Sequence, residues 1–116
     1  MTTIELLQKT RVAWPALSTA PAEEKNRLLL AMADALESHI PAILAANARD
    51  MADAEGHISA VMLDRLRLDE GRVRAMADGV RAAAALPDHT GRALAQFTRP
   101  NGMTITKRQV PLGLVA

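Results

Sequence analysis

With 116 residues and a formal net charge of +1, the chain is long enough for one domain with one core, and its bias toward Ala and Leu favours helix over sheet. The absence of cysteine excludes a disulfide framework and a thiol nucleophile within this sequence, and the basic excess of residues 99–108 is too small to indicate nucleic-acid binding. No stretch approaches the about 18 uninterrupted apolar residues of a membrane helix, and the N-terminus lacks a signal-peptide pattern, so we expect a soluble, cytoplasmic protein without a membrane partner.

A first helix is predicted from about Thr3 to Trp14, where apolar residues recur at helical spacing. Thr2 or Thr3 is the expected N-cap. Because Pro15 disfavours α geometry at the residue before it, the helix should stop or bend at Trp14. Trp14 could stack on a ligand or anchor this helix on the body of the protein, and we favour the anchor.

A second helix is predicted to begin at Ser18-Thr19-Ala20-Pro21, which combines a hydroxyl cap with a proline in the first turn. It should run to about Ser38. Asp34 and Glu37 fall mostly off its apolar stripe and are expected on a solvated face. The predicted buried stripe consists of Leu28, Leu29, Met32, Leu36 and Ile40.

Pro41 is expected to restart the chain in a third helix, which should stop at Glu55-Gly56. Its inner face carries Ile43, Leu44, Asn47 and Met51. Asn47 lies among small residues, where neighbouring backbone can approach closely, and a buried amide must be hydrogen-bonded. We favour a structural role in which Asn47 ties this helix to a loop, over a contact with substrate.

Two further helices are predicted, one capped by Ser59 and one capped by Asp69 and ending at Leu86-Pro87. Their expected apolar faces are Val61, Met62, Leu63 and Leu66 in the first, and Val73, Met76, Val80 and Ala84 in the second. Arginines in this region alternate with acids, so ion pairs on helix surfaces are the expected explanation. The residues concerned are Asp64, Arg65, Arg67, Asp69, Glu70, Arg72, Arg74, Asp78 and Arg81.

The last part of the chain changes to a strand pattern. Two strand-like runs, 92–99 and 103–110, flank the turn sequence Pro100-Asn101-Gly102 and predict a β-hairpin, which needs further strands because a two-stranded ribbon is marginal in water. After Pro111 the residues become fully apolar, which is typical of a strand buried on both faces of a parallel sheet. We therefore expect the opening section of a larger α/β protein.

No catalytic constellation is present in the sequence. The histidines His39, His57 and His89 lack metal-type spacing and are expected at the surface or at helix ends. Gly113 stands alone rather than in a phosphate-binding loop, and Asp50 and Asp53 imply no apolar pocket. The sequence therefore predicts no catalytic, cofactor-binding or metal-ligating residue within this chain.

Five short motifs resemble a known enzyme family in their order and separations. They are Glu24-Lys25-Asn26-Arg27, Met32-Ala33-Asp34-Ala35-Leu36, Ala46-Asn47-Ala48-Arg49-Asp50, Met62-Leu63-Asp64-Arg65-Leu66 and Arg108-Gln109-Val110-Pro111-Leu112-Gly113. Over nearly its whole length the chain thus resembles gamma-glutamyl phosphate reductase, also called glutamate-5-semialdehyde dehydrogenase, of the aldehyde dehydrogenase superfamily. The Pro-Leu-Gly element alone is common in that superfamily, and the combination of motifs is the specific signal.

The resemblance implies an α/β parent fold of which this portion is mainly helical. Residues 1–90 would form an N-terminal helical layer on the dinucleotide-binding domain, residues 91–110 a hairpin of the oligomerisation sheet, and residues 111–116 the truncated first strand of the dinucleotide-binding domain. The implied activity is NADPH-dependent reduction of L-glutamyl 5-phosphate to L-glutamate 5-semialdehyde in proline biosynthesis. A cytoplasmic homo-oligomer and coupling to glutamate 5-kinase are also implied.

The family mechanism begins with attack of a cysteine thiolate on the acyl phosphate, and hydride from the nicotinamide then reduces the resulting thioester. This chain has no cysteine, so no catalytic residue of the family maps onto it. Arg108 and Asn47 match family positions and are expected to serve packing and orientation. The portion alone is predicted to be inactive and to bind no NADPH.

Two other interpretations remain open. The first is a free-standing, non-catalytic interaction or oligomerisation module, in which the hairpin edge and the apolar tail pair with a partner by strand addition and promote self-association. The second is another acyl-reducing relative in the aldehyde dehydrogenase superfamily, such as a CoA-dependent enzyme.

Overall fold

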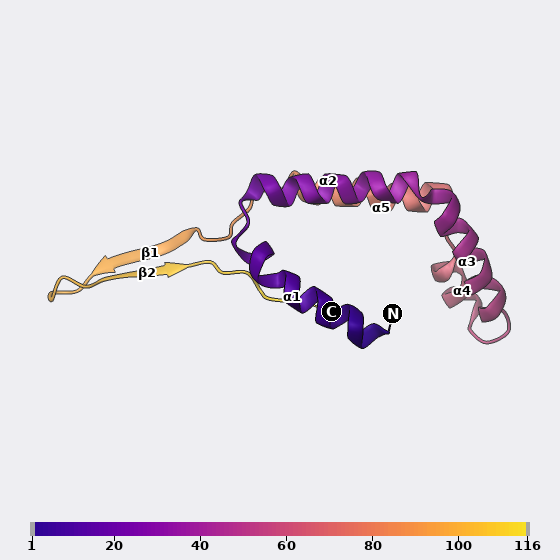
Figure 1. The fold of residues 1–116 in the computed structure, drawn as a ribbon, viewed down its shortest axis with the longest axis horizontal. Helices are drawn as coiled ribbons and strands as arrows, with labels where there is room; N and C mark the ends of the chain where they lie inside the picture. Colours follow the sequence, from indigo (N-terminus) through magenta and orange to yellow (C-terminus); the bar gives the residue numbers. More distant parts are fainter. Residues whose placement is uncertain (1, 116) are drawn as a thin grey trace. The chain divides into compact units, whose positions relative to one another are not determined.

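The computed structural model describes residues 2–115, and Met1 and Ala116 lie outside the described part. The described chain is mainly helical with one antiparallel hairpin, as predicted (Figure 1). It divides into two compact units, one formed by Glu23–Leu86 and the other by the segments on either side of it. The elements are α1 (Thr3–Thr19), α2 (Ala22–Ser38), α3 (Ile40–Ala54), α4 (Ala60–Leu66), α5 (Glu70–Ala84), β1 (Ala93–Thr98) and β2 (Thr104–Arg108).

The start of α1 is fixed by a reciprocal cap. The backbone N–H of Glu5 donates to Thr2 Oγ1 at 3.3 Å, and the backbone N–H of Thr2 donates to Glu5 Oε2 at 2.8 Å. Two amides that have no partner within the helix are thereby satisfied. Thr2, one of the two predicted caps, is the N-cap of α1.

The end of α1 differs from the prediction. The helix continues through Pro15 to Thr19, so the expected stop or bend at Trp14 is wrong as a stop. A proline in the last turns of a helix removes one hydrogen bond, and here side chains satisfy carbonyls nearby: Ser18 Oγ donates to Pro15 O at 2.8 Å and Thr19 Oγ1 to Ala16 O at 3.3 Å. These hydroxyls therefore close α1, whereas the sequence predicted a hydroxyl cap for α2. Trp14 is half-buried, and its role as an anchor stays a prediction.

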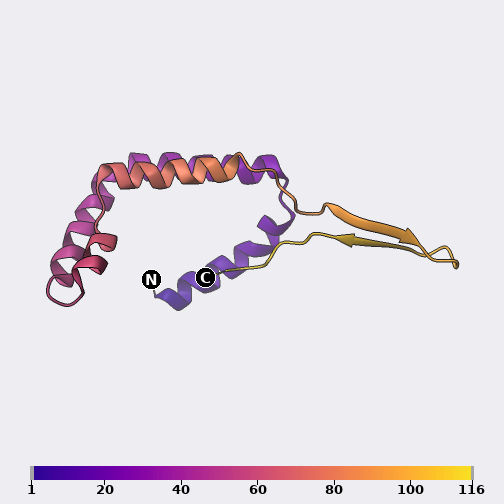
Figure 2. The ribbon, with the colours of Figure 1, turned by 180° about the vertical axis from the view of Figure 1, so that it is seen from behind.

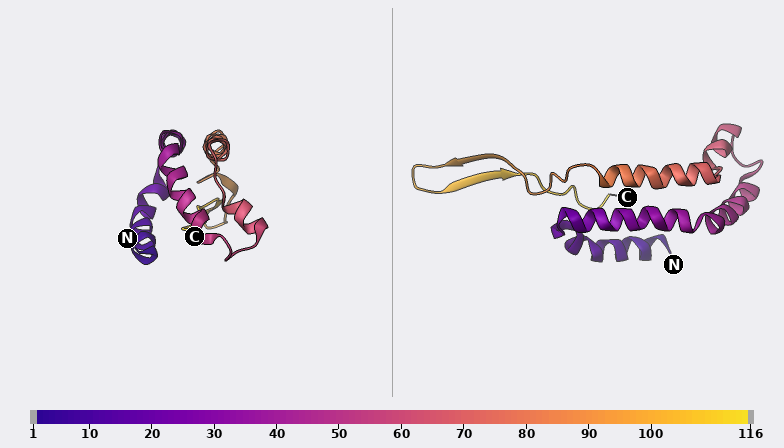
Figure 3. Two further views of the ribbon diagram at one scale, coloured as in Figure 1. Left: turned by 90° about the vertical axis from the view of Figure 1, so that its right-hand side faces the viewer. Right: turned by 90° about the horizontal axis from the view of Figure 1, so that it is seen from above.

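Within the Glu23–Leu86 unit, α2 and α5 lie side by side and antiparallel, while α3 and α4 form a second helical pair (Figures 1, 2 and 3). The buried positions are small or aliphatic, and side chains of this size let helices approach closely. The buried apolar residues are Ala33, Ile40, Val73, Ala77 and Ala84.

The predicted buried stripes need correction. On α2 the inner line is Leu29, Ala33 and Leu36, and the expected members Leu28 and Met32 are 46% and 56% exposed. Ile40, the last expected member, is buried but belongs to α3. Positions 29, 33 and 36 follow one helical line, whereas positions 28 and 32 are rotated about 100° away from it. For the same geometric reason Val61, Met62 and Met76 are exposed on α4 and α5, and Ala77 takes the buried place expected for Met76.

The predicted boundaries of α3 and the predicted starts of α4 and α5 are confirmed, whereas α5 ends at Ala84, before the expected Leu86-Pro87. α3 begins at Ile40-Pro41 and ends before Glu55, and Gly56 follows with φ +78°, a conformation that favours glycine. Ser59 Oγ accepts from Met62 N at 3.3 Å and Asp69 Oδ1 accepts from Arg72 N at 2.7 Å, which are N-terminal caps.

Among residues 2–115 no single helix is long and apolar enough to cross a membrane; α2 and α3 reach that length and composition only together, with a 66° bend between them.

The predicted hairpin is present. β1 and β2 pair antiparallel with Phe97 opposite Ile105 and Thr98 opposite Thr104, and an irregularity lies between Ala93 and Ala95. At the tip, Gly102 N donates to Arg99 O at 2.9 Å, and Gly102 has φ +82°, as a three-residue turn of this kind requires. Every residue of β1 is exposed, so the prediction that the ribbon needs further strands stays open.

The tail after Pro111 does not form the predicted strand in this chain. Residues 112–115 are irregular, and Leu112 and Val115 are 98% and 77% exposed. A parallel strand is held by hydrogen bonds to neighbours on both sides, and the described residues supply no such neighbour. The predicted end of this strand, Ala116, lies outside the described residues.

Candidate functional site

The side chain of Asn47 joins α3 to the connection between α4 and α5. Asn47 is 7% exposed, its Nδ2 donates to Leu66 O at 2.9 Å, and its Oδ1 accepts from Leu68 N at 2.8 Å. The side-chain amide thus offers the backbone one donor, Nδ2, and one acceptor, Oδ1, and both are used. This confirms the predicted structural role of Asn47, since both polar ends of its side chain are occupied by this chain's own backbone.

Arg72, in the first turn of α5, holds the same connection from the other side. Its Nη1 donates to Asp64 O and, at 2.6 Å, to Arg67 O, and its Nη2 forms an ion pair with Asp64 Oδ1 at 3.2 Å. The last carbonyls of a helix have no partner within that helix. Arg72 and Asn47 therefore satisfy the C-terminal carbonyls of α4, which gives a structural reason for the motif Met62-Leu63-Asp64-Arg65-Leu66. We refer to Asn47, Arg72 and the 64–68 backbone as the α4 clamp.

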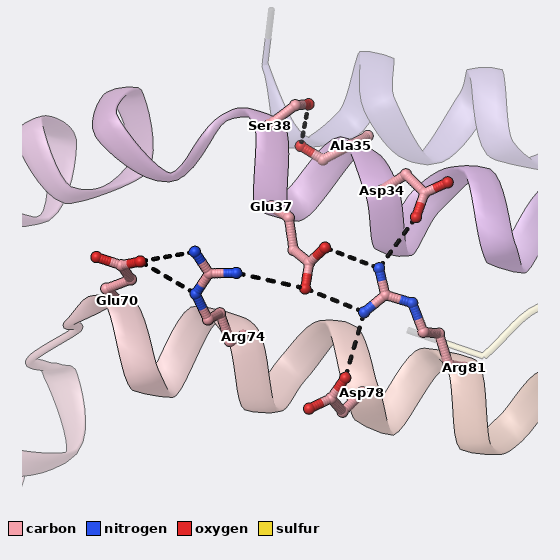
Figure 4. Close-up of polar contacts among 8 residues, drawn as sticks. All are labelled: Asp34, Ala35, Glu37, Ser38, Glu70, Arg74, Asp78 and Arg81. Atoms are coloured by element: carbon pink, nitrogen blue, oxygen red, sulfur yellow. Dashed lines mark hydrogen bonds and ion pairs between the residues drawn. The ribbon is translucent and has the colours of Figure 1, made fainter.

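A second polar cluster joins α2 to α5 (Figure 4). Arg81 meets Glu37 with both terminal nitrogens, Nη1 to Oε1 at 3.1 Å and Nη2 to Oε2 at 2.8 Å. Arg81 also contacts Asp34 Oδ1 at 3.0 Å and Asp78 Oδ1 at 3.2 Å. A two-pronged arginine–carboxylate contact fixes orientation as well as distance, so this pair sets the register of α5 against α2.

Arg74 extends this cluster by one turn. Its Nη2 lies 2.7 Å from Glu70 Oε1, and its Nη1 lies 3.9 Å from Glu37 Oε1 (Figure 4). The hydrogen bonds from Arg81 hold the pKa of Glu37 below its ordinary value of 4.5, although partial burial opposes this shift. The pKa of Arg74 is raised by Glu70, and the pKa of Arg81 is raised by Glu37, so both stay charged.

The sequence predicted part of this cluster. Pairs along one helix, Arg74 with Glu70 and Arg81 with Asp78, confirm the expected ion pairs on helix surfaces. The contacts between helices were missed, because Glu37 was assigned to a solvated face and instead is 31% exposed and shared by two arginines. The sequence did hold a signal for these contacts: Asp34 and Glu37 are three residues apart on one helix, and two arginines are seven apart on another. This spacing predicts ion pairs only when the two helices are known to be antiparallel neighbours (Figure 3).

Successive pairs across the hairpin place an apolar and a polar contact on opposite faces. Phe97 lies opposite Ile105 on one face, whereas Thr98 Oγ1 and Thr104 Oγ1 lie 3.3 Å apart on the other. The guanidinium of Arg99 stands 5.7 Å from the centre of the Phe97 ring. At the base, Arg108 Nη1 donates to Gly91 O at 2.9 Å, which is an orienting contact of the kind predicted for Arg108.

Neither cluster is arranged for chemistry. In residues 2–115 no group of three or more His, Asp or Glu side chains could hold a metal ion. His39, His57 and His89 are exposed, as predicted, with His39 Nδ1 at 2.8 Å from Ala35 O at the end of α2. A dinucleotide needs backbone amides around its pyrophosphate. Gly113, the glycine of the predicted nucleotide-binding strand, has φ +100° in an irregular tail, so the expectation that this portion binds no cofactor stays a prediction.

The geometry defines a helical unit held together by its polar motifs, and a separate β-hairpin. No family model matches the chain. It is, however, 51% identical over 109 residues to the gamma-glutamyl phosphate reductase of Neisseria gonorrhoeae, covering 94% of this chain and 26% of that protein. The match to the reductase of Geotalea daltonii is 47% identical over 120 residues, covering 99% of this chain and 29% of the relative.

A solved structure agrees with these relatives. The crystal structure of gamma-glutamyl phosphate reductase from Thermotoga maritima superposes with a TM-score of 0.84 at 30% identity, covering 93% of this chain and 26% of that one. The chain therefore spans about a quarter of the length of the proteins it matches, and the matched part is N-terminal. The resemblance inferred from the five motifs is confirmed: this chain is similar to the N-terminal quarter of gamma-glutamyl phosphate reductase.

Proposed function

We propose that this chain is the N-terminal part of an oxidoreductase that reduces L-glutamyl 5-phosphate to L-glutamate 5-semialdehyde with NADPH, in proline biosynthesis in the cytoplasm. The observation that carries the proposal is the similarity to named reductases over nearly the whole chain. The α4 clamp supports it, because two of the matched motifs meet in that one structural feature. A nicotinamide cofactor follows from the reductase name, and the choice of NADPH is part of the proposal.

Within that enzyme, the role we assign to this portion is to hold the rest in place. Residues 1–90 would cover the dinucleotide-binding domain, residues 91–110 would join an oligomerisation sheet, and residues 111–116 would become a strand once neighbours are available. The exposure of every residue of β1 and the 98% exposure of Leu112 support this arrangement, since exposed apolar residues are stabilised by pairing and cover. Homo-oligomerisation and coupling to glutamate 5-kinase belong to the same proposal.

The chemistry of the whole enzyme would come from residues outside this chain. Reduction of an acyl phosphate through a thioester needs a thiol, and this sequence contains none. We also expect the described residues to offer no cradle for the dinucleotide, and no catalytic step is assigned to them. The isolated chain is therefore expected to show no turnover and no NADPH binding at micromolar concentrations.

A chimeric enzyme tests this division of labour. The N-terminal segment of the Neisseria gonorrhoeae reductase that aligns with this chain is replaced by it, and oxidation of glutamate 5-semialdehyde by NADP⁺ is followed in the presence of phosphate. We expect activity comparable to that of the parent reductase. A chimera that folds and assembles but is inactive would contradict the proposal, and the isolated chain provides the negative control.

Two alternatives predict different results. If the chain is a free-standing interaction module, favoured by the exposed hairpin, it should self-associate in sedimentation and should not restore activity to the chimera. If its complete enzyme is a CoA-dependent relative, that enzyme should reduce an acyl-CoA in preference to glutamyl phosphate. Assaying the complete gene product on both substrates separates this relative from the reductase.

A further inference from the structure

We propose that Asn101-Gly102, at the tip of the hairpin, is a site of spontaneous deamidation and isomerisation, where the asparagine converts to aspartate and isoaspartate through a cyclic imide. Asparagine followed by glycine is the pair most prone to this reaction, because glycine has no side chain to hinder its own backbone nitrogen. Both residues are exposed, and a Cβ placed on Gly102 would meet nothing within 4 Å. Solvent base can therefore reach the tip, although the Gly102 N–H itself is held in a hydrogen bond to Arg99 O.

The turn orients the reacting amide. Met103 N donates to Asn101 Oδ1 at 3.1 Å. When the Gly102 nitrogen adds to Asn101 Cγ, negative charge develops on Oδ1, and a hydrogen-bond donor already placed there stabilises it. An opposing contact is the donation of Gly102 N–H to Arg99 O at 2.9 Å, which must open before the nitrogen can attack. Opening of the hairpin tip is thus a required step of the reaction.

The reaction balances without an oxidant or a cofactor. Base removes the Gly102 N–H proton, a bond forms between Gly102 N and Asn101 Cγ, and the bond from Cγ to Nδ2 breaks as ammonia leaves with a proton. Water then opens the five-membered imide at one of its two carbonyls. The net change is replacement of NH₂ by OH. In isoaspartate, one of the two products, the peptide bond to Gly102 is made by the former side-chain carbonyl.

Both products change the tip. Aspartate puts a carboxylate near Arg99, whose guanidinium stands over Phe97. Isoaspartate adds one carbon to the main chain within the three-residue turn, so the contact from Arg99 N to Met103 O at 2.8 Å should be lost. We therefore expect the hairpin to lose its tip register as the protein ages.

The chain contains its own controls. Asn47 is buried in α3 and Asn26 is half-buried in α2, and neither precedes glycine. Asp78-Gly79 has the reactive sequence for isomerisation but lies inside α5, where the Gly79 nitrogen is fixed in helical geometry and Asp78 Oδ1 contacts Arg81. Because a carboxylate cyclises more slowly than an amide whatever its fold, Asp78 is compared with itself in the folded and the unfolded chain, and a rise on unfolding would show that α5 protects it.

The test is incubation of the whole chain in mildly alkaline buffer, followed by peptide mapping with fragmentation that distinguishes isoaspartate from aspartate. We expect conversion at Asn101 to exceed that at Asn26 and Asn47 several-fold, to increase with pH, and to disappear in Asn101→Gln. In urea, where α5 is unfolded, isomerisation at Asp78 should rise above its own level in the folded chain. Conversion at Asn101 no greater than at Asn26, with the hairpin shown to be folded by its NMR strand contacts, would overturn the proposal.

Discussion

Replacing Asn47 by alanine tests whether the α4 clamp organises the helical unit. The substitution removes both hydrogen bonds of the amide and leaves Leu66 O and Leu68 N–H without their partner. An unsatisfied buried backbone group costs about 1–3 kcal/mol. Because Leu66 and Leu68 are half-buried and water can reach them in part, we expect a loss of about 2–4 kcal/mol in the free energy of unfolding.

Such a loss is large for a chain of this size. Stabilities of about 0.05–0.15 kcal/mol per residue are usual for folded domains, so the loss would be a large part of the total. Urea unfolding followed by circular dichroism measures it. The matched control is Asn26→Ala on α2, for which we expect a change within about 0.5 kcal/mol.

A second measurement separates loss of the clamp from general loosening. The Leu68 amide donates to Asn47 Oδ1, so its hydrogen exchange should accelerate more in Asn47→Ala than exchange in the middle of α2 does. Asn47→Asp keeps an acceptor for Leu68 but turns an oxygen toward Leu66 O, and it should also destabilise the chain. Unchanged stability of Asn47→Ala, or uniform acceleration of exchange, would refute the reasoning.

Three further predictions concern the same helical unit. Val73→Ala should cost about 2 kcal/mol in urea unfolding, because Val73 is fully buried, whereas Val12→Ala at an 82% exposed position should change stability by less than about 0.5 kcal/mol. The stability that Glu37 contributes should be fully present above pH 4.5 and lost as the pH falls through its lowered folded-state pKa. Thermal unfolding across that range measures this, and Glu37→Gln should reduce the pH dependence by the part that Glu37 contributes. Arg72→Lys keeps the charge, but a lysine cannot reach both carbonyls and the carboxylate. We expect a loss of about 1 kcal/mol in the free energy of unfolding. Unaltered stability would count against the role of Arg72 at the C-terminus of α4.

Features encoded within a few residues were predictable from the sequence. Thr2, Ser59 and Asp69 cap helices because their side chains reach amides only three residues ahead, and Pro100-Asn101-Gly102 specifies its own turn. Asn47 was also predicted correctly, because a buried amide must find backbone partners wherever the chain provides them. In each case the local chemistry allows few alternatives.

Features that depend on distant neighbours were not predictable in the same way. Glu37 is placed by Arg81, which lies 44 positions further along the chain, so its burial follows from the pairing of α2 with α5. α1 continues past Pro15, and the hydroxyls of Ser18 and Thr19, which the sequence pattern assigned to the next helix, bond carbonyls in its last turn. The strand expected after Pro111 requires flanking strands, and residues 112–115 are irregular without them.

The most direct test of the central claim is the intact mass of this gene's product, isolated from its own cells. If the chain is the scaffold portion of a reductase, as the matches to about a quarter of each relative suggest, the mass should be several-fold above 12.4 kDa. A mass of 12.4 kDa would contradict that account, because a cell that makes only these residues makes no thiol nucleophile.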